Sequence, residues 1–358
     1  MSKVSPRFPS PVTGFQAELR NRVDAYFQDT HQLPTGNGKL YFKTLVIVLY
    51  FISIYTALVF FNTGTGWSLL LCILLGGGVA TIGFNIMHDG AHGSYSSSRI
   101  INDIAASSLD FLGASSFMWR TKHNVIHHTY TNIHEFDDDL NVRPLLRLAP
   151  EQRRLSFHQY QYIYAIPLYG LLHIVWITYK DFLKYFTGKI GSISFKKMTL
   201  TDELTFWGSK ISFLLFFVFL PVYMKGIIAY LIGFSVFSMA TGIFISTVFQ
   251  LAHVVETVEF PLPDEVTHRM EDEWAIHQVK TTANFANKSA LVTWLAGGLN
   301  FQIEHHLFPK VSHVHYPAIS KIVKQTCADY GVPYHEFPTT ADALRSHIEY
   351  LRHLGQAA

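Results

Sequence analysis

The histidines of this sequence gather in three short clusters whose spacing suits metal binding. The first is His-Asp-Gly-Ala-His at 88–92, the second His-Asn-Val-Ile-His-His at 123–128, and the third Gln-Ile-Glu-His-His at 302–306. Residues four apart share one face of a helix and lie about 6 Å apart along its axis. Two imidazoles at that spacing can converge on one ion, and the extra histidine of the second cluster could serve another. The pattern therefore predicts a metal centre built from all three clusters.

The number of imidazoles narrows the choice of metal. His253 adds a further candidate at the end of a long apolar run, whereas Cys72 and Cys327 have no neighbouring thiol. Zinc usually takes four ligands and favours closed sets that include cysteine, so these histidines are too many for one zinc ion. Imidazole also suits iron and copper. Two irons with open positions could reduce O2 and remove hydrogen from an unactivated methylene, which no amino-acid side chain can do.

Long uncharged segments precede the first cluster and His253. Hydrophobic residues make up 49% of the 358 residues and charged residues 15%, against about 25% charged in a typical soluble domain. Residues 44–87 contain no Asp, Glu, Lys or Arg, and 211–252 contain only Lys225. About 20 residues cross the hydrocarbon core once, and turn-forming residues interrupt both runs, at 62–66 and 224–226. We expect four membrane spans, near 41–61, 67–87, 206–223 and 227–250.

Basic residues set the orientation of these spans. The two short connectors carry only Lys225, whereas Lys and Arg are frequent before residue 44 and between 88 and 205. The positive-inside rule places both termini and the long middle segment in the cytoplasm. Segments 88–205 and 251–358 then share one face and hold every histidine except His31. We expect a single all-α integral membrane domain over 1–358, four transmembrane helices with a cytoplasmic helical cap made of 88–205 and 251–358.

Two further apolar segments are expected to lie in the interface plane. Residues 160–179 could span, but His253 and the third cluster would then emerge on the face opposite the first two clusters. Gln161, Pro167 and His173 also weaken this segment as a lipid-facing helix. Residues 101–117 contain Asp103 and Asp110, so we place them in the interface as well. Short helices are expected over 318–329 and 340–354, the second capped by Thr339 or Thr340.

The three clusters, in this order and between paired spans, resemble the histidine boxes of the membrane fatty-acid desaturase family. The Gln that opens the third box resembles the front-end subgroup, which includes delta-5, delta-6 and linoleoyl-CoA-type enzymes. The resemblance continues in Thr-Tyr-Thr-Asn at 129–132, in the Asp run at 137–139 and in Gly-Gly-Leu-Asn at 297–300, and covers roughly residues 30–355. Because no His-Pro-Gly-Gly haem signature occurs, we expect no fused cytochrome b5-type domain.

This resemblance implies an O2-dependent desaturase that puts a cis double bond into a fatty acyl chain, carried by CoA or by a lipid. It implies two iron ions, cycling between Fe2+ and Fe3+, bound by His88, His92, His123, His127, His128, His253, His305 and His306. Gln302 stands where other branches have another histidine and is a further candidate ligand. With no flavin, haem or iron–sulfur motif in the sequence, we expect a separate ferredoxin or cytochrome b5-type electron donor, which Arg147, Arg153 and Arg154 could attract.

Less direct roles are expected for several polar and aromatic residues. Metal-bound histidines usually donate their second nitrogen to a carboxylate or carbonyl, and our candidates for this contact are Asp89, Glu304, the Asp137–Asp139 run, Asp110 and Asn300. A solvated charge cluster or a helix cap would explain the Asp run equally well. His313 and His315 alternate rather than follow a helical spacing, so we expect structural or substrate contacts there. Trp119, Trp274 and Trp294 could line an acyl tunnel or anchor the protein at the membrane surface.

Two other classes of function remain open at this stage. A hydroxylase, ketolase or decarboxylase with the same histidines would use the same irons and differ only in its product. A non-enzymatic metal transporter would need ionisable residues within its spans, and residues 44–87 and 211–252 offer only Lys225. The net charge of +2 and the lack of a basic block give no reason to expect nucleic-acid binding.

Overall fold

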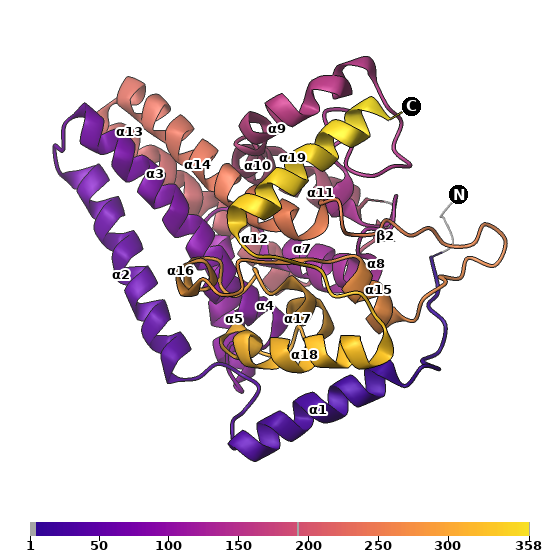
Figure 1. Ribbon diagram of the computed structural model, residues 1–358. Coiled ribbons are helices and arrows are strands. Elements are labelled where there is room, and N and C mark those ends of the chain that lie inside the picture. Colours follow the sequence, from indigo (N-terminus) through magenta and orange to yellow (C-terminus); the bar gives the residue numbers. More distant parts are fainter. Residues whose placement is uncertain (1–4, 192, 358) are drawn as a thin grey trace.

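The computed structural model describes residues 5–191 and 193–357, and it is almost entirely helical (Figure 1). Long apolar helices stand together at the left of that view, and shorter helices pack beside their ends (Figure 1). The long helical elements are α2 (Gly38–Phe60), α3 (Thr65–Ile82), α12 (Leu200–Phe213), α13 (Leu220–Lys225) and α14 (Ile227–His253). Two short sheets complete the fold, antiparallel β1 (Lys189–Ile190) with β2 (Ile193–Ser194) and parallel β3 (Asn284–Phe285) with β4 (Glu336–Phe337).

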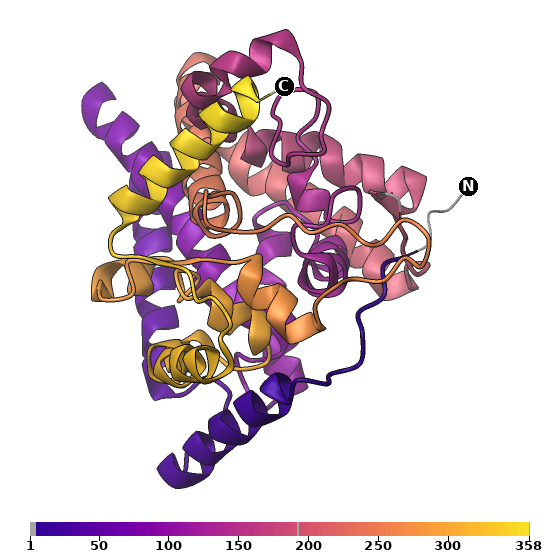
Figure 2. The same ribbon diagram turned by 45° about the vertical axis from the view of Figure 1, so that its right-hand side comes forward.

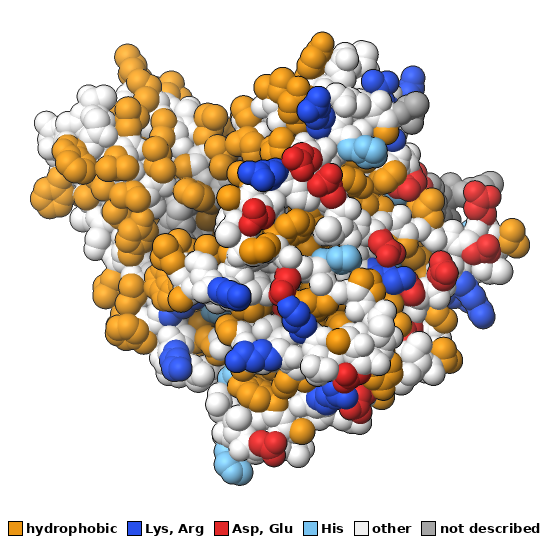
Figure 3. Space-filling model, in the orientation of Figure 1, with side chains coloured by type: hydrophobic (Ala, Val, Ile, Leu, Met, Phe, Trp, Pro, Cys, Tyr) orange, Lys and Arg blue, Asp and Glu red, His pale blue; other side chains and the backbone are white. Residues whose placement is uncertain are grey.

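The four expected spans are confirmed as helices long and apolar enough to cross a membrane. Within the described residues these helices are Gly38–Phe60, Thr65–His92, Leu200–Lys225 and Ile227–His253. Each is longer than predicted. The second and third continue through π-helical turns, η1 (Gly83–Met87) and η6 (Leu214–Phe219), which widen the helix by one residue without ending it. Hydrophobic side chains cover the surface over α2, α3 and α14, whereas charged side chains gather over the remaining helices (Figure 3).

Close packing of α3 on α14 brings the ends of the second and fourth spans together. A side chain at Gly76 would place its Cβ 2.8 Å from the carbonyl oxygen of Phe237, so only glycine allows this approach. The spans that contain α3 and α14 continue to His88 and His253, so these two histidines lie at the same depth. The helix contact therefore fixes the depth at which the first histidine cluster meets His253.

Short helices from both halves of the chain pack beside the long apolar helices. Their number reflects frequent Gly, Pro and polar residues, which end helices after one or two turns. They are α1 (Phe15–Thr30), α4 (His88–His92), α5 (Arg99–Ala106), α6 (Ser108–Phe111), α7 (Ser116–Arg120), η2 (Thr121–His127), α8 (His128–Tyr130), η3 (Asp138–Leu140), η4 (Ser156–Tyr160), α9 (Gln161–Tyr169), α10 (Leu172–Val175), η5 (Trp176–Lys180), α11 (Asp181–Thr187), α15 (Trp274–Lys280), α16 (Ala290–Leu295), α17 (Gln302–Leu307), η7 (His313–His315), α18 (Tyr316–Tyr330) and α19 (Thr340–Gln356).

The C-terminal helices agree with the expectation from sequence. Thr339 caps α19, accepting from the amide of Asp342 while the Asp342 carboxylate accepts from Thr339. The other helix, α18, begins at Tyr316, two residues earlier than expected, because Pro317 favours the first turn. It lies against α1 along the lower edge in both ribbon views (Figures 1 and 2).

The segment predicted to lie in the interface plane is a bent pair of helices. Ser156–Tyr169 and Leu172–Thr187 meet at an angle of 71°, so residues 160–179 do not form one straight span. The second such segment, 101–117, is divided among α5, α6 and α7, and α5 exposes Ile100, Ile101 and Ile104. Placement of both segments at the membrane surface stays a prediction.

One expectation about the surface is wrong. Arg147 is buried, and its guanidinium donates to the backbone carbonyls of Pro150, Leu354 and Ala357. These hydrogen bonds hold the 144–150 loop against the end of α19. Because the Arg147 side chain is buried there, it is not accessible to an electron donor. Arg153 and Arg154 are exposed, although Arg154 also donates to the carbonyl of Gly355.

Candidate metal centre

The first histidine cluster lies on α4, which continues the second span beyond its π-turn. His88 and His92 lie on one face, with ring centroids 4.7 Å apart. Gly90 faces the other way, against α5, where a Cβ atom would come within 2.6 Å of the amide nitrogen of Ala106. The His-Asp-Gly-Ala-His pattern thus presents two imidazoles to the interior and lets a neighbouring helix pack closely behind them.

The second cluster occupies the π-helical turn η2 and the first residue of α8. His123 and His127 stack with centroids 5.2 Å apart, and the Nε2 atom of His128 lies 3.2 Å from that of His123. A π-helical turn holds more residues per turn than an α-helix, which allows all three rings of this segment to face the same interior.

The third cluster lies on α17, where His305 and His306 are fully buried. Gly297 makes this position possible, because its φ is +58° and a Cβ atom there would lie 2.3 Å from the carbonyl oxygen of Phe84. The Gly-Gly-Leu-Asn motif therefore lets the chain before α17 pass directly against the π-turn before α4. This contact brings the first and third clusters together.

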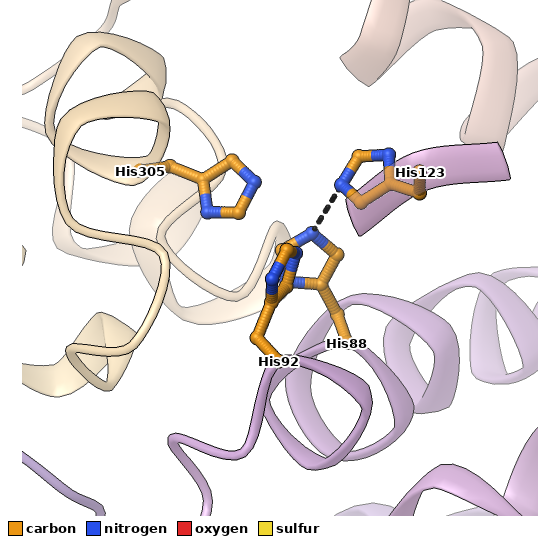
Figure 4. A group of neighbouring side chains, drawn as sticks. All are labelled: His88, His92, His123 and His305. Atoms are coloured by element: carbon orange, nitrogen blue, oxygen red, sulfur yellow. Dashed lines mark hydrogen bonds between the residues drawn. The ribbon is translucent and has the colours of Figure 1, made fainter. Parts of the chain in front are cut away.

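The eight predicted imidazoles lie together in two groups. His88, His92, His123 and His305 form one group, in which one ring nitrogen from each residue lies within 4.8 Å of the others (Figure 4). His127, His253 and His306 form the other group by the same measure. His128 groups with both His305 and His306, so it lies between the two. Each of these groups could hold a metal ion.

The donor atoms of these groups fit a metal. The Nε2 atoms of His92, His127 and His305 are buried and have no hydrogen-bond partner, although buried polar atoms are nearly always paired. Burial, with the neighbouring imidazoles, lowers the pKa of His123, His128, His305 and His306 well below the ordinary value. Their rings are therefore neutral at pH 7, and each keeps a lone pair that can bind a metal ion.

Several of these imidazole rings are oriented by hydrogen bonds at Nδ1, the ring nitrogen that faces away from the centre. His127 Nδ1 lies 3.0 Å from Asp137 Oδ2, and His306 Nδ1 lies 2.8 Å from the Gln278 amide oxygen. His305 Nδ1 lies 3.2 Å from the Tyr316 hydroxyl. Because carboxylate and amide oxygens only accept, His127 and His306 carry their proton on Nδ1 and direct Nε2 into the centre. No motif in the sequence pointed to Gln278 or Tyr316 as a partner of these histidines.

Asp137 belongs to the Asp137–Asp139 run proposed from sequence for such contacts, whereas four other candidates have other partners. Asp89 accepts from the hydroxyl of Ser312 and lies 3.0 Å from His313 Nδ1. Glu304 accepts from Asn284 and Tyr334, and its burial raises its pKa to about 7. Asn300 donates to Thr293, and Asp138 lies 3.8 Å from Lys184. Asp89 thus joins α4 to the segment before α18, with His313 in the structural role expected of it.

Gln302 lies inside the second group. Its amide Nε2 is 2.9 Å from His253 Nε2 and 3.5 Å from His306 Nε2, and its amide oxygen is buried without a partner. An amide so placed can offer its oxygen to a metal or to a water bound there. Its role as a ligand stays a prediction.

A cavity of about 460 Å³ leads to the centre and reaches His88, His123 and Gln302. Its lining includes many apolar side chains, among them Val79, Met87 and Leu109. Among the three tryptophans considered from sequence, Trp119 lines the cavity and stacks on His123 with centroids 4.4 Å apart. By contrast, Trp274 donates to the carbonyl of His128, and Trp294 lies under the ammonium of Lys43.

The contact between the Asp137 carboxylate and His127 Nδ1 leads to a prediction about metal affinity. Burial alone would lower the pKa of His127, but the Asp137 carboxylate outweighs it and raises this pKa. Asp137→Asn should lower metal affinity by about 10- to 100-fold, because the neutral amide is a weaker acceptor and does not fix the Nδ1 proton. Metal titration of the purified variant measures this. Asp138→Asn is the matched control, and an equal loss in that variant would contradict the assignment to Asp137.

Comparison with known proteins gives consistent matches. A model of the family described as fatty acid desaturase matches residues 65–338. The sn-1 linoleoyl-lipid 6-desaturase of Synechocystis sp. is 38% identical over 346 residues, which are 96% of either chain. The acyl-lipid (8-3)-desaturase of Physcomitrium patens is 40% identical over 95% of this chain and 72% of its own length. That of Mortierella alpina is 34% identical over 99% of this chain and 80% of its own length.

Proposed function

Because the chain belongs to the fatty acid desaturase family, we propose that it introduces a cis double bond into a lipid-linked acyl chain at a centre of two iron ions. Its activity as an oxidoreductase that desaturates fatty acyl chains follows from the family match and the named relatives. The observation that carries the finer proposal is the cavity of about 460 Å³ that ends at His88 and His123. A cavity of this volume could hold a single acyl chain.

The proposed ligands divide between the two irons. One ion would be held by His88, His92, His123 and His305, the other by His127, His253 and His306, with His128 between them. Bound iron supplies the reduction of O2 and the removal of two hydrogens from neighbouring carbons of the chain. The protein holds eight neutral or hydrogen-bonded imidazoles in fixed orientations, so ligand geometry is set before substrate arrives.

The side chains of the cavity position the substrate. Val79, Met87 and Leu109 exclude water and hold the methylenes in an apolar environment. Trp119 stacks on His123 and forms part of the cavity wall beside the first histidine group. A chain in contact with this wall presents one pair of carbons to the centre, and a small shift along the cavity changes which pair reacts.

We also propose an external electron donor and a cytoplasmic centre. Each desaturation consumes two electrons that the histidines and substrate do not supply, so a ferredoxin or cytochrome b5-type protein must dock near the cap. Arg153 and Arg154 are exposed and could attract an acidic partner. The basic residues of the cap support the positive-inside orientation, with the termini and residues 88–205 and 251–358 in the cytoplasm.

Site-directed labelling tests this orientation. Cysteines at Gly64 and Lys225, in the two short connectors, should react with a reagent that cannot cross the membrane when it is added outside intact cells. Cysteines at Ser97 and Pro263 should react only after the membrane is opened. Labelling of Pro263 from outside would place His253 and the third cluster on the face opposite the first two clusters and overturn the shared centre.

Fatty-acid profiling of a host that expresses the protein tests the function. We expect a new species with one more double bond when linoleate is fed, since two relatives are named as linoleoyl-lipid 6-desaturases. The species should be absent from a host that expresses His305→Ala. A hydroxylated, oxidised or shortened chain in its place would favour the hydroxylase, ketolase or decarboxylase alternatives and overturn desaturation.

A further inference from the structure

We call the exposed part of the cavity lining, which includes Arg143 and Tyr179, its mouth. Four basic side chains line the cavity, Lys122, Arg143, Lys180 and Lys184, together with three carboxylates, Asp138, Asp139 and Asp181. Lys122 lies in η2, the two aspartates at 138 and 139 in η3, Arg143 in the loop that follows, and the residues at 180–184 in η5 and α11.

The ion pairs among these described residues leave two basic side chains without a carboxylate partner, Arg143 and Lys180. Lys122 pairs with Asp139, and Lys184 lies 3.8 Å from Asp138. Asp181 is paired with Lys210, at 2.8 Å, which does not line the cavity. Within residues 5–191 and 193–357, neither Arg143 nor Lys180 forms an ion pair. In the part of the chain that the structure describes, the one side-chain hydrogen bond of Arg143 is donated to the amide oxygen of Asn141, and Lys180 is half-buried.

Exposed apolar side chains surround the same opening. Leu145, Leu171, Val175 and Tyr179 line the cavity and expose 36–59% of their surface. Apolar residues in this number around an opening are expected where the opening meets lipid rather than water. The mouth thus combines a lipid-compatible rim with two unpaired cations, a pattern suited to a molecule with an acyl chain and an anionic headgroup.

We propose that Arg143 and Lys180 bind the phosphate of the substrate headgroup, which makes the preferred substrate an anionic phospholipid whose acyl chain enters the cavity toward His88. The guanidinium offers a planar fork to the phosphate oxygens, and the ammonium adds a second charged donor. This inference rests on the proposed function, since the cavity is taken to hold the acyl substrate. An acyl-CoA carries the same phosphate chemistry, but the apolar rim favours a substrate that enters from the membrane.

Direct binding tests the proposal independently of turnover. Native mass spectrometry of the full-length protein would compare linoleoyl phosphatidylglycerol, linoleoyl-CoA and a neutral linoleoyl galactolipid. The wild-type protein should bind the phospholipid at least about tenfold more tightly than the galactolipid, as charge-assisted hydrogen bonds allow. Arg143→Gln with Lys180→Gln should abolish this preference and raise KM for the phospholipid about tenfold, with kcat within about twofold of wild type.

Matched variants separate recognition from folding. Lys189→Gln removes an exposed lysine outside the cavity and should change nothing, and Lys180→Arg should keep the preference. Equal wild-type affinity for charged and neutral lipids, or an unchanged preference in the double variant, would overturn the headgroup assignment. Charge-dependent binding of linoleoyl-CoA alone would support phosphate recognition but overturn the lipid as its source. Charge-dependent binding without any new double bond would instead count against the proposed function.

Discussion

Replacing His127 with Ala should remove one iron and reduce turnover below about 1% of wild type, while the protein still inserts into the membrane. His127 is fully buried, belongs to the group with His253 and His306, and directs an unpaired Nε2 into the centre. Without its imidazole that group retains two histidines, too few to hold an ion firmly. The four apolar helices lie outside η2, so insertion should be unaffected.

Iron analysis of purified protein is the decisive measurement. Wild type should contain two irons per chain and His127→Ala about one. The substitution also leaves the buried carboxylate of Asp137 without its imidazole partner, which by itself destabilises the fold. His127→Gln keeps an amide donor for Asp137 but offers no imidazole, so it should insert well and still lose iron. His353→Ala removes an exposed histidine of α19 and should match wild type. Full iron in both His127 variants would remove His127 from the ligand set.

Gln302→His should be the least damaging substitution at its position, retaining iron and part of the activity. The amide lies 2.9 Å from His253 Nε2 and 3.5 Å from His306 Nε2, within reach of the ion that the second group would hold. An amide oxygen is a weaker and harder ligand for iron than imidazole, so Gln302 should leave one iron more open to O2. An imidazole introduced there can still reach the metal.

Gln302→Ala and Gln302→Ile should lose activity by about 10- to 100-fold while most of the iron stays bound. Ile nearly fills the space of Gln, so a loss in that variant reports the missing amide rather than a cavity. Turnover and iron content measured on the same preparations separate the two effects. Wild-type turnover and full iron in Gln302→Ile would mean that Gln302 only hydrogen-bonds its neighbours.

The sequence determined the parts of this protein that depend on local patterns. Uncharged runs such as 44–87 must avoid water along their whole length, so four apolar helices could be predicted from composition alone. Four-residue spacing places His88 and His92 on one face of any helix that contains them. Together with the histidine boxes, these patterns were enough to identify the family and the residues that gather at the centre.

Other features depended on where distant segments meet. The sequence pointed to the Asp137–Asp139 run as a whole, and only the structure shows that Asp137 contacts His127 whereas Asp138 lies near Lys184. Gln278 and Tyr316 reach His306 and His305 through chain paths that no local pattern specifies. In the same way, the end of α19 covers Arg147, which sequence alone placed on the surface.

The substrate cavity likewise exists only in the folded protein. Its walls combine η1, the loop after the second box, the bent helix pair and α14, and its unpaired cations become apparent only once their neighbours are placed. Hydropathy and spacing are properties of neighbouring residues, so they determine helices and the faces that helices present. Hydrogen-bond partners, burial of individual charges and the shape of a cavity are set by packing between distant segments, which only the tertiary structure decides.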